Sequence, residues 1–265
     1  MKFIVTGASS GIGQALRKRY AERPKDFGGD LIFLSNDWRL GNEFETEDNN
    51  CRLIHLAHSR TLTLEQNIAA INKISNLIIP GSIFLSTVSA HSQSQSNYGK
   101  SKFHIENYFL NRGATVVKSG LICAEHPKAM LKLLHRLVIR FPIIPLPFNG
   151  DNPFYLTSEQ SLVSLIAELT QSPRNLNIRA FSNENITFKN LLQDLATVHK
   201  VKRLFVPLPE NISFFFITIF KTIFGQLSFV DSLVSLLNSP HRSEILQLSD
   251  SGVDFPANPH LIKYN

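Results

Sequence analysis

Cysteine is scarce in this sequence: the chain of 265 residues has two, Cys51 and Cys123. Two residues cannot supply the disulfide framework of a small secreted scaffold, and both lie inside apolar runs, so we interpret them as buried thiols. No spacing of His, Cys, Asp or Glu typical of a metal site is present, and no internal repeat or low-complexity tract occurs. These absences exclude the disulfide-rich, zinc-binding and repeat-array classes.

A charged and apolar leader is also lacking, since the chain starts directly on an apolar run. We therefore expect a cytoplasmic protein. The formal net charge of +6 is not accompanied by a nucleic-acid motif or by aromatic residues interleaved with the basic ones, so we expect no nucleic-acid partner. With 43% hydrophobic residues, the chain is able to bury the core of one α/β unit with a smaller lobe.

The first thirteen residues, MKFIVTGASSGIG, join an apolar run to a glycine-rich turn and the start of a helix. The turn needs glycines for a tight bend, for close approach to a pyrophosphate and for close packing of the helix, and the helix N-terminus then faces the phosphates. A purely structural turn is the alternative interpretation. The predicted dinucleotide-binding residues here are Gly7, Ser9, Ser10, Gly11, Ile12 and Gly13.

Apolar runs typical of strands alternate with helical segments in the first half of the chain. We expect strands at 2–6, 30–35, 51–57, 82–87 and 114–119, and helices at 11–22, 63–78 and 97–111. This alternation predicts an α/β fold with a Rossmann-like, doubly wound parallel sheet. Only about fifteen residues separate the second expected strand from the third. They are too few for the helix, strand and helix that usually lie between such strands of a doubly wound sheet, so the intervening strand is vestigial or missing.

The pattern changes beyond Gly120, which predicts a small C-terminal substrate lobe. We place a dinucleotide-binding domain at 1–125 and a substrate-binding lobe at 126–265, with helices that return to the Rossmann core. The lobe begins with a long apolar and basic helix and a Pro-rich segment. Thr157 and Gln160 form a candidate capping box for the next helix, and a further helix is expected from residue 186 to about residue 199.

Tyr98 and Lys102 lie four residues apart in the segment YGKSK, so they share one face of a helix. A tyrosine has a reference pKa of about 10, and a nearby cation lowers it toward the range useful for acid/base chemistry. Such pairs are also common on solvated helices. Upstream, an apolar strand ends in hydroxyl residues, of which Thr87 is the last.

Together with the glycine turn, this set resembles the short-chain dehydrogenase/reductase family, in particular its extended branch of nucleotide-sugar epimerases and dehydratases. The resemblance covers most of the chain, although the glycine spacing is that of the compact branch and the strand-three region is short. It implies that Thr87 orients the substrate and that Tyr98 is the catalytic acid/base. It also implies that Lys102 lowers the pKa of the tyrosine and binds the nicotinamide ribose.

The same resemblance implies where the cofactor lies. The strand at 53–57 is similar to the fourth strand of the family, whose backbone, here at Leu56 and Ala57, runs beside the cofactor. Asn67 falls near the position of a family asparagine in the next helix.

Cofactor choice depends on the end of the second strand, where a carboxylate favours NAD and an arginine favours NADP. Both signals occur in the segment that follows the second expected strand. Its side chains give a slight preference for NADP over NAD through Ser35, Asn36 and Arg39.

A basic stripe and an apolar segment fit more than one interpretation. The stripe recurs every four residues, at Lys128, Lys132, Arg136 and Arg140. It is a solvated helix face, a contact for substrate phosphates, or a contact with a membrane surface at its inner face. The apolar segment 212–230 is interpreted as a buried lobe helix, with an interfacial membrane helix as the alternative.

Two classes of function remain open. The first is an NAD(P)-dependent epimerase, dehydratase or ketoreductase that acts on a phosphate-bearing small molecule similar to a nucleotide sugar. The second is a non-catalytic NAD(P)-binding sensor or a membrane-associated assembly protein. An acid/base pair favours the enzyme, because a sensor does not need one. The sequence leaves the substrate open, as it does the choice between a monomer and a homodimer.

Overall fold

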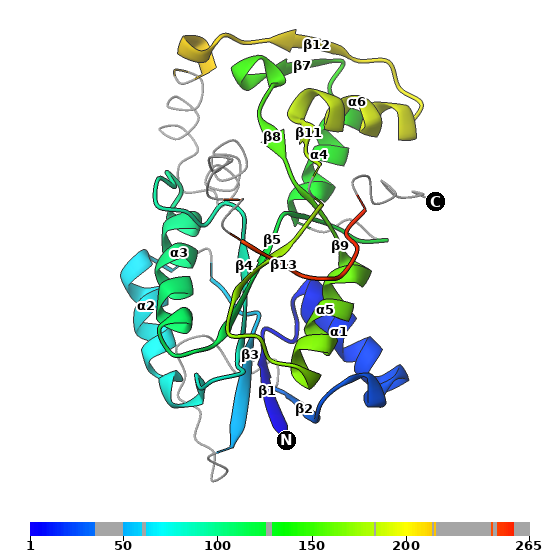
Figure 1. Ribbon diagram of the computed structural model, residues 1–265. Helices are drawn as coiled ribbons and strands as arrows, with labels where there is room; N and C mark the ends of the chain where they lie inside the picture. Colours follow the sequence, from blue (N-terminus) through cyan, green and yellow to red (C-terminus); the bar gives the residue numbers. More distant parts are fainter. Residues whose placement is uncertain are drawn as a thin grey trace.

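The computed structural model of this chain describes residues 1–34, 50–59, 62–125, 129–182, 184–213, 215, 245 and 248–256. Its centre is a seven-stranded sheet in the order β13-β10-β5-β4-β3-β1-β2, and all neighbouring pairs are parallel (Figure 1). The strands are β1 (Lys2–Thr6), β2 (Asp30–Phe33), β3 (Cys51–His55), β4 (Ile83–Thr87), β5 (Thr115–Ser119), β10 (Asn177–Ala180) and β13 (Ser249–Asp250). The predicted α/β fold with a doubly wound parallel sheet is confirmed.

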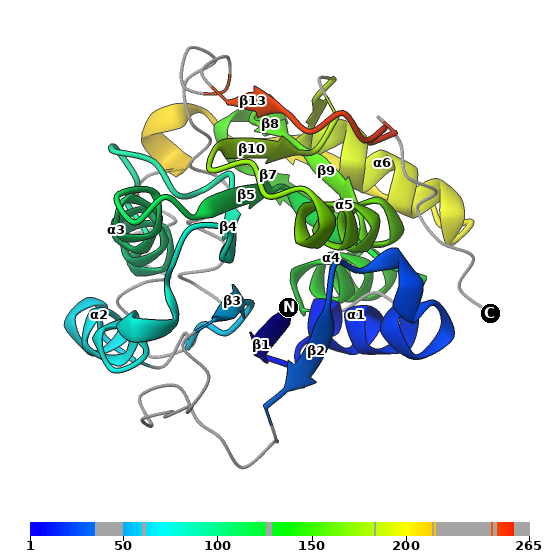
Figure 2. The ribbon, with the colours of Figure 1, turned by 60° about the horizontal axis from the view of Figure 1, so that its bottom comes forward.

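Helices cover both faces of this sheet (Figure 2). One face carries α1 (Gly11–Glu22), η1 (Pro24–Asp26) and α5 (Glu159–Gln171), and the other carries α2 (Leu64–Asn72), η2 (Ser75–Leu77) and α3 (Asn97–Leu110). Side chains alternate between the two cores as the pleat requires, so Phe3 and Val5 pack with α1 and α5, whereas Ile4 packs with α2 and α3. Burial on both faces explains why the strands are apolar throughout.

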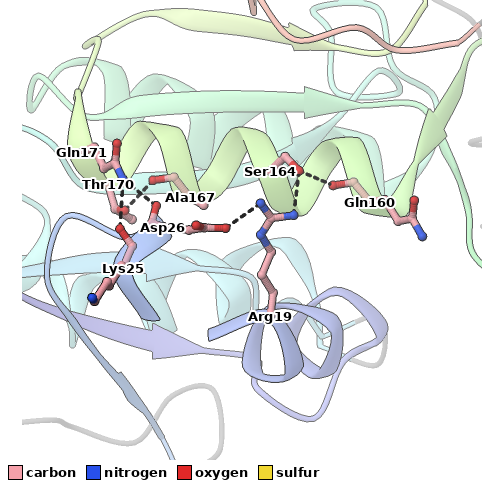
Figure 3. Close-up of polar contacts among 8 residues, drawn as sticks. All are labelled: Arg19, Lys25, Asp26, Gln160, Ser164, Ala167, Thr170 and Gln171. Atoms are coloured by element: carbon pink, nitrogen blue, oxygen red, sulfur yellow. Dashed lines mark hydrogen bonds and ion pairs between the residues drawn. The ribbon is translucent and has the colours of Figure 1, made fainter. Parts of the chain in front are cut away.

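Polar contacts fasten α5 to α1 and η1 (Figure 3). The Arg19 guanidinium donates to the Ser164 hydroxyl at 3.0 Å and to the Asp26 carboxylate at 2.8 Å. The Gln171 amide donates to the Asp26 carbonyl at 2.8 Å. A helix from the second half of the chain therefore returns to the sheet, as do β10 and β13, while the boundary at residue 125 stays a prediction.

The remaining elements form a smaller lobe, most of which lies at the top of Figure 1. They are β6 (Leu121–Cys123), α4 (Ala129–Arg140), β7 (Ile143–Leu146), η3 (Pro147–Gly150), β8 (Pro153–Phe154), β9 (Leu156–Ser158), β11 (Ile186–Thr187), α6 (Phe188–Val198) and β12 (Leu204–Pro207). Apolar residues of α4 and α6, among them Leu131, Leu134 and Leu195, form its core. Cys51 and Cys123 are buried free thiols, as expected.

The predicted capping box at Thr157 is wrong by one residue. Ser158 is the N-cap of α5, and its hydroxyl accepts the N–H of Ser161 at 3.3 Å. The Thr157 side chain is fully buried, accepts the N–H of Gly120 at 2.8 Å and donates to the Ala180 carbonyl at 2.6 Å. Two adjacent hydroxyl residues made the cap ambiguous, and the tertiary contacts of Thr157 decide it.

Candidate active site

Two glycines of the first turn are required by close backbone contacts. Gly7 has φ +72°, and a Cβ at this position would lie 2.6 Å from the backbone nitrogen of Ala57. A Cβ at Gly13 would collide with the Gly7 carbonyl oxygen. The turn therefore packs on the segment after β3, and α1 packs on the turn, as the predicted roles of these glycines require.

The N-terminus of α1 presents backbone donors at this turn. Ser10 is the N-cap, and its hydroxyl accepts the N–H of Gly13 at 3.0 Å. Within the described part of the chain, the N–H groups of Gly11 and Ile12 have no acceptor. Ser9 is exposed beside them, whereas the Ile12 side chain is buried in the core. Donors of this kind at a helix N-terminus fit a phosphate group.

The segment after β3 lies against the same turn. The Leu56 N–H donates to the Thr6 carbonyl at 3.2 Å, which places the backbone of Leu56 and Ala57 beside Gly7. Asn67 of α2 is buried, and its amide donates to the Ser59 carbonyl at 3.1 Å. Asn67 thus fixes the loop that follows Leu56 and Ala57.

Tyr98 and Lys102 lie on one face of α3, as predicted. The half-buried Tyr98 ring contacts the His58 ring edge-on, with the ring centroids 4.9 Å apart. Lys102 is 4% exposed, and its ammonium donates to the Leu85 carbonyl at 2.6 Å. The same ammonium lies 4.6 Å from the centroid of Phe84 and 6.0 Å from that of Tyr98. The lysine therefore lies between the tyrosine and β4.

Thr87 is the last residue of β4 and pairs in register with Ser119 of β5. It stands two residues beyond Leu85, the residue that accepts from Lys102. The structure thus brings Thr87, Tyr98, Lys102 and the glycine turn to the carboxyl ends of β1, β3 and β4. The predicted cofactor-selecting residues Ser35, Asn36 and Arg39 lie outside the described residues.

A buried ion pair beneath this edge was not expected from the sequence. The Glu106 carboxylate of α3 lies 3.1 Å from the Lys118 ammonium and accepts a hydrogen bond from the Ser86 hydroxyl. Burial raises the pKa of Glu106 to about 7, although Lys118 opposes the shift. The available signal was spacing, since Glu106 follows Lys102 by the same four residues that separate Lys102 from Tyr98.

His55 is a second titratable group that the sequence did not single out. Its Nδ1 lies 2.7 Å from the Thr6 hydroxyl, and its ring stacks on Phe84 and Phe109. Burial and then the charge of Lys102 lower the pKa of His55 to about 3. The imidazole is therefore neutral at physiological pH and adds no second cation to the site.

No protein-family model matches the sequence, and no curated protein matches it. Solved structures match by fold. The dTDP-4-dehydrorhamnose reductase of Bacillus anthracis in complex with NADP is 16% identical with TM-score 0.61, and the match covers 79% of this chain and 84% of that one. An NAD-dependent NDP-hexosamine 5,6-dehydratase of tunicamycin biosynthesis is 14% identical with TM-score 0.59, covering 78% and 84%. The UDP-N-acetylglucosamine 4-epimerase of Bacillus cereus is 16% identical with TM-score 0.57, covering 79% and 85%. At these identities the matches establish the fold, and the activity has to be argued from the site.

Proposed function

We propose that this chain is an NAD(P)-dependent enzyme of the short-chain dehydrogenase/reductase type. Its substrate is a small molecule similar to a nucleotide sugar, and its reaction is an epimerisation, a dehydration or a keto reduction. One series of contacts carries this proposal: Gly7 packs on Ala57, and the next residue, His58, contacts the ring of Tyr98. These contacts bring the glycine turn and Tyr98 to the carboxyl edge of the sheet, where open α/β sheets bind ligands, which supports a dinucleotide at the turn and acid/base chemistry at Tyr98.

The structural matches support this assignment. The Bacillus anthracis reductase is in complex with NADP, and the dehydratase is NAD-dependent. The third match is an epimerase of a UDP-linked sugar. In this chain the backbone donors of Gly11 and Ile12 and the glycine cradle fit the pyrophosphate of either cofactor. The slight preference for NADP rests on Ser35, Asn36 and Arg39.

The proposed mechanism divides the work among three side chains. The bound nicotinamide supplies a site that accepts or returns a hydride at the sugar carbon. The Tyr98 oxygen removes the proton of the substrate hydroxyl as the carbonyl forms, and returns it in the opposite direction. The Thr87 hydroxyl binds the same substrate oxygen and fixes its orientation. The Lys102 ammonium favours the phenolate electrostatically and binds the nicotinamide ribose.

Titration of the purified protein with NADP and NAD, followed by product analysis with UDP- and dTDP-sugars, tests the proposal. We expect saturable binding of at least one dinucleotide and conversion of a sugar nucleotide. Absence of binding to both dinucleotides would refute the cofactor assignment. Binding without turnover of any sugar nucleotide would instead support the non-catalytic sensor.

A further inference from the structure

A small sheet of the lobe has apolar residues on both faces. β7 and β12 pair in parallel, with Leu204 opposite Ile143 and Val206 opposite Pro145. The intervening Ile144 is buried in the lobe core, as strand alternation requires. On the outer face, Ile143 is 55% exposed and Leu204 is 60% exposed. We call this outer set, Ile143, Pro145, Leu204 and Val206, the apolar face.

Two further exposed apolar side chains belong to the chain segments next to these strands. Phe141, between α4 and β7, is 51% exposed, and Phe215, shortly after β12, is 66% exposed. The Arg203 guanidinium donates to the carbonyls of Val138 and Ile139, which ties the start of β12 to the end of α4. The elements therefore form one continuous region at the top of Figure 1. Neighbouring exposed apolar side chains such as those of the apolar face mark an interaction site more often than singly scattered ones do.

The positive charge of the chain is concentrated in the same region. The segments 129–150 and 195–209 contain six basic residues and no acidic one. The whole chain has 27 basic and 21 acidic residues, so the rest has 27 − 6 = 21 of each sign. The two segments thus carry a charge of +6, and acidic residues adjoin them at Asp151, Asp194 and Glu210. The six basic residues are Lys132, Arg136, Arg140, Lys200, Lys202 and Arg203.

The exposed part of the basic stripe leads to the apolar face. Lys132, Arg136 and Arg140 are exposed along α4, and Arg140 directly precedes Phe141. On the other side, Lys200 and Lys202 are exposed just before β12. Apolar side chains preceded by basic residues on both strands match the two layers of an anionic membrane surface, its acyl boundary and its phosphates; the exposed Glu210, after β12, is the acidic exception. A contact with substrate phosphates alone would leave the apolar face unexplained.

We propose that this region docks on an anionic lipid bilayer, with the apolar face at the acyl boundary and the basic residues on the lipid phosphates. The proposal rests on surface residues outside the candidate active site, so it stands apart from the enzymatic function. Among the residues that the structure describes, every helix is too short or too polar to cross a bilayer. Most of the apolar segment 212–230 lies outside the described residues.

Flotation with vesicles of phosphatidylcholine, with and without phosphatidylglycerol, tests this docking surface. We expect the protein to float at low salt with the anionic vesicles and to remain unbound with phosphatidylcholine alone. Two double variants should each bind the anionic vesicles about ten-fold more weakly, or weaker still. They are Lys132→Glu/Arg136→Glu and Ile143→Ser/Leu204→Ser. All four positions are solvent-exposed, which favours folding of the variants.

Matched controls separate this surface from charge or hydrophobicity in general. Lys18→Glu/Lys73→Glu changes the net charge equally at exposed sites of the sheet unit. Ile32→Ser/Leu176→Ser removes apolar side chains that are 41% and 46% exposed elsewhere. Both controls should bind vesicles as the unchanged chain does. Equal losses in the controls, or no flotation of the unchanged chain at low salt, would refute the proposal.

Size-exclusion chromatography tests a second copy of the chain as the alternative occupant. The lipid proposal would be overturned if the unchanged chain is a dimer that does not float with vesicles, and if Ile143→Ser/Leu204→Ser dissociates that dimer. Dinucleotide titration of each variant checks folding and should be unchanged. If the unchanged chain binds no dinucleotide, the enzymatic proposal is refuted and the lipid result is unaffected.

Discussion

Glu106 of α3 and Lys118 of β5 form a buried ion pair, with 3.1 Å between carboxylate and ammonium, below the end of β4. The Ser86 hydroxyl donates to the same carboxylate, and the Lys118 ammonium donates to the Ala90 carbonyl at 2.5 Å. These contacts hold both sides of Thr87, because Ser86 precedes it and Ala90 follows it. The pair therefore fixes the chain on both sides of Thr87, whose hydroxyl we propose to orient the substrate.

The first prediction concerns the pH dependence that Glu106 gives to stability. Its pKa is about 7 in the folded chain against 4.5 ordinarily, because burial disfavours the charged form. This contribution to stability is complete below pH 4.5 and is lost as the pH rises through 7. His55 acts in the opposite sense: its pKa falls from 6.5 to about 3, so its contribution is complete above pH 6.5 and is lost as the pH falls.

Between pH 5 and pH 7 the two effects are each worth about 2 kcal/mol and nearly cancel. Other groups also titrate in this range, because the pKa of His135 is lowered to about 4, so each variant is compared with the unchanged chain. From pH 5 to pH 7 the free energy of unfolding of Glu106→Gln should rise by about 2 kcal/mol more than that of the unchanged chain. His55→Phe keeps an aromatic ring on Phe84, and its free energy of unfolding should rise by about 2 kcal/mol less over the same pH range than that of the unchanged chain. Urea unfolding at the two pH values measures both differences. If the free energy of unfolding changes equally with pH in both variants, the assigned pKa shifts are contradicted.

The second prediction separates two glycines of the turn. Gly7→Ala forces a side chain into a left-handed conformation and against Ala57, so it should lower the free energy of unfolding by about 1–3 kcal/mol. Gly11→Leu places a side chain at the proposed phosphate-binding face of the first helical turn and should abolish dinucleotide binding with the fold kept. Circular dichroism and dinucleotide titration of both variants distinguish the effects. Normal titration of Gly11→Leu would exclude the turn as the pyrophosphate site.

The third prediction assigns separate roles to the acid/base pair. Tyr98→Phe removes the phenol hydroxyl, so it should abolish turnover with little change in dinucleotide affinity. Lys102→Met should impair both, because the ammonium is proposed to bind ribose as well as to favour the phenolate. Steady-state kinetics and cofactor titration measure the two effects. Substantial turnover in Tyr98→Phe would show that another group transfers the proton.

The fourth prediction tests the corrected helix cap. Thr157→Val leaves the Gly120 N–H and the Ala180 carbonyl buried without partners, which should cost about 2–4 kcal/mol. Thr157→Ser keeps the hydroxyl and should lose much less. Ser158→Ala removes only the N-cap bond, with an expected cost of about 1 kcal/mol. Chemical denaturation ranks the three variants, and a smaller loss for Thr157→Val than for Ser158→Ala would restore the capping-box interpretation.

The features predicted well from the sequence are local ones. The turn at Gly7 and the pair Tyr98 and Lys102 depend on spacing within one strand-turn-helix or one helix, and periodicity is sufficient to place them. The parallel, doubly wound character of the sheet followed from alternating strands and helices, but its strand order was not predicted. The expected bounds 11–22 of the first helix agree with α1 because Ser10 is a strong N-cap.

Long-range contacts were beyond sequence reasoning. Glu106 and Lys118 come from different elements, and nothing in their separation along the chain shows that they pair. The Pro-rich segment 141–147 contains β7, whose partner β12 lies far along the sequence. An isolated apolar run does not reveal which of its faces a distant strand leaves exposed, so the exposure of Ile143 and Leu204 emerged only in three dimensions.

The ribosome makes β5 well before it makes β10, the strand that pairs with it. β10 pairs with β5, and the Val116 N–H donates to the Leu176 carbonyl at 2.9 Å, yet the ribosome makes the whole of α4 and α5 between these strands. A nascent chain that ends before β10 therefore presents β5 as an unpaired edge, with its backbone groups and Val117 open to other strands. A chaperone that shields strand edges is therefore needed most while the ribosome makes the segment from β5 to β10.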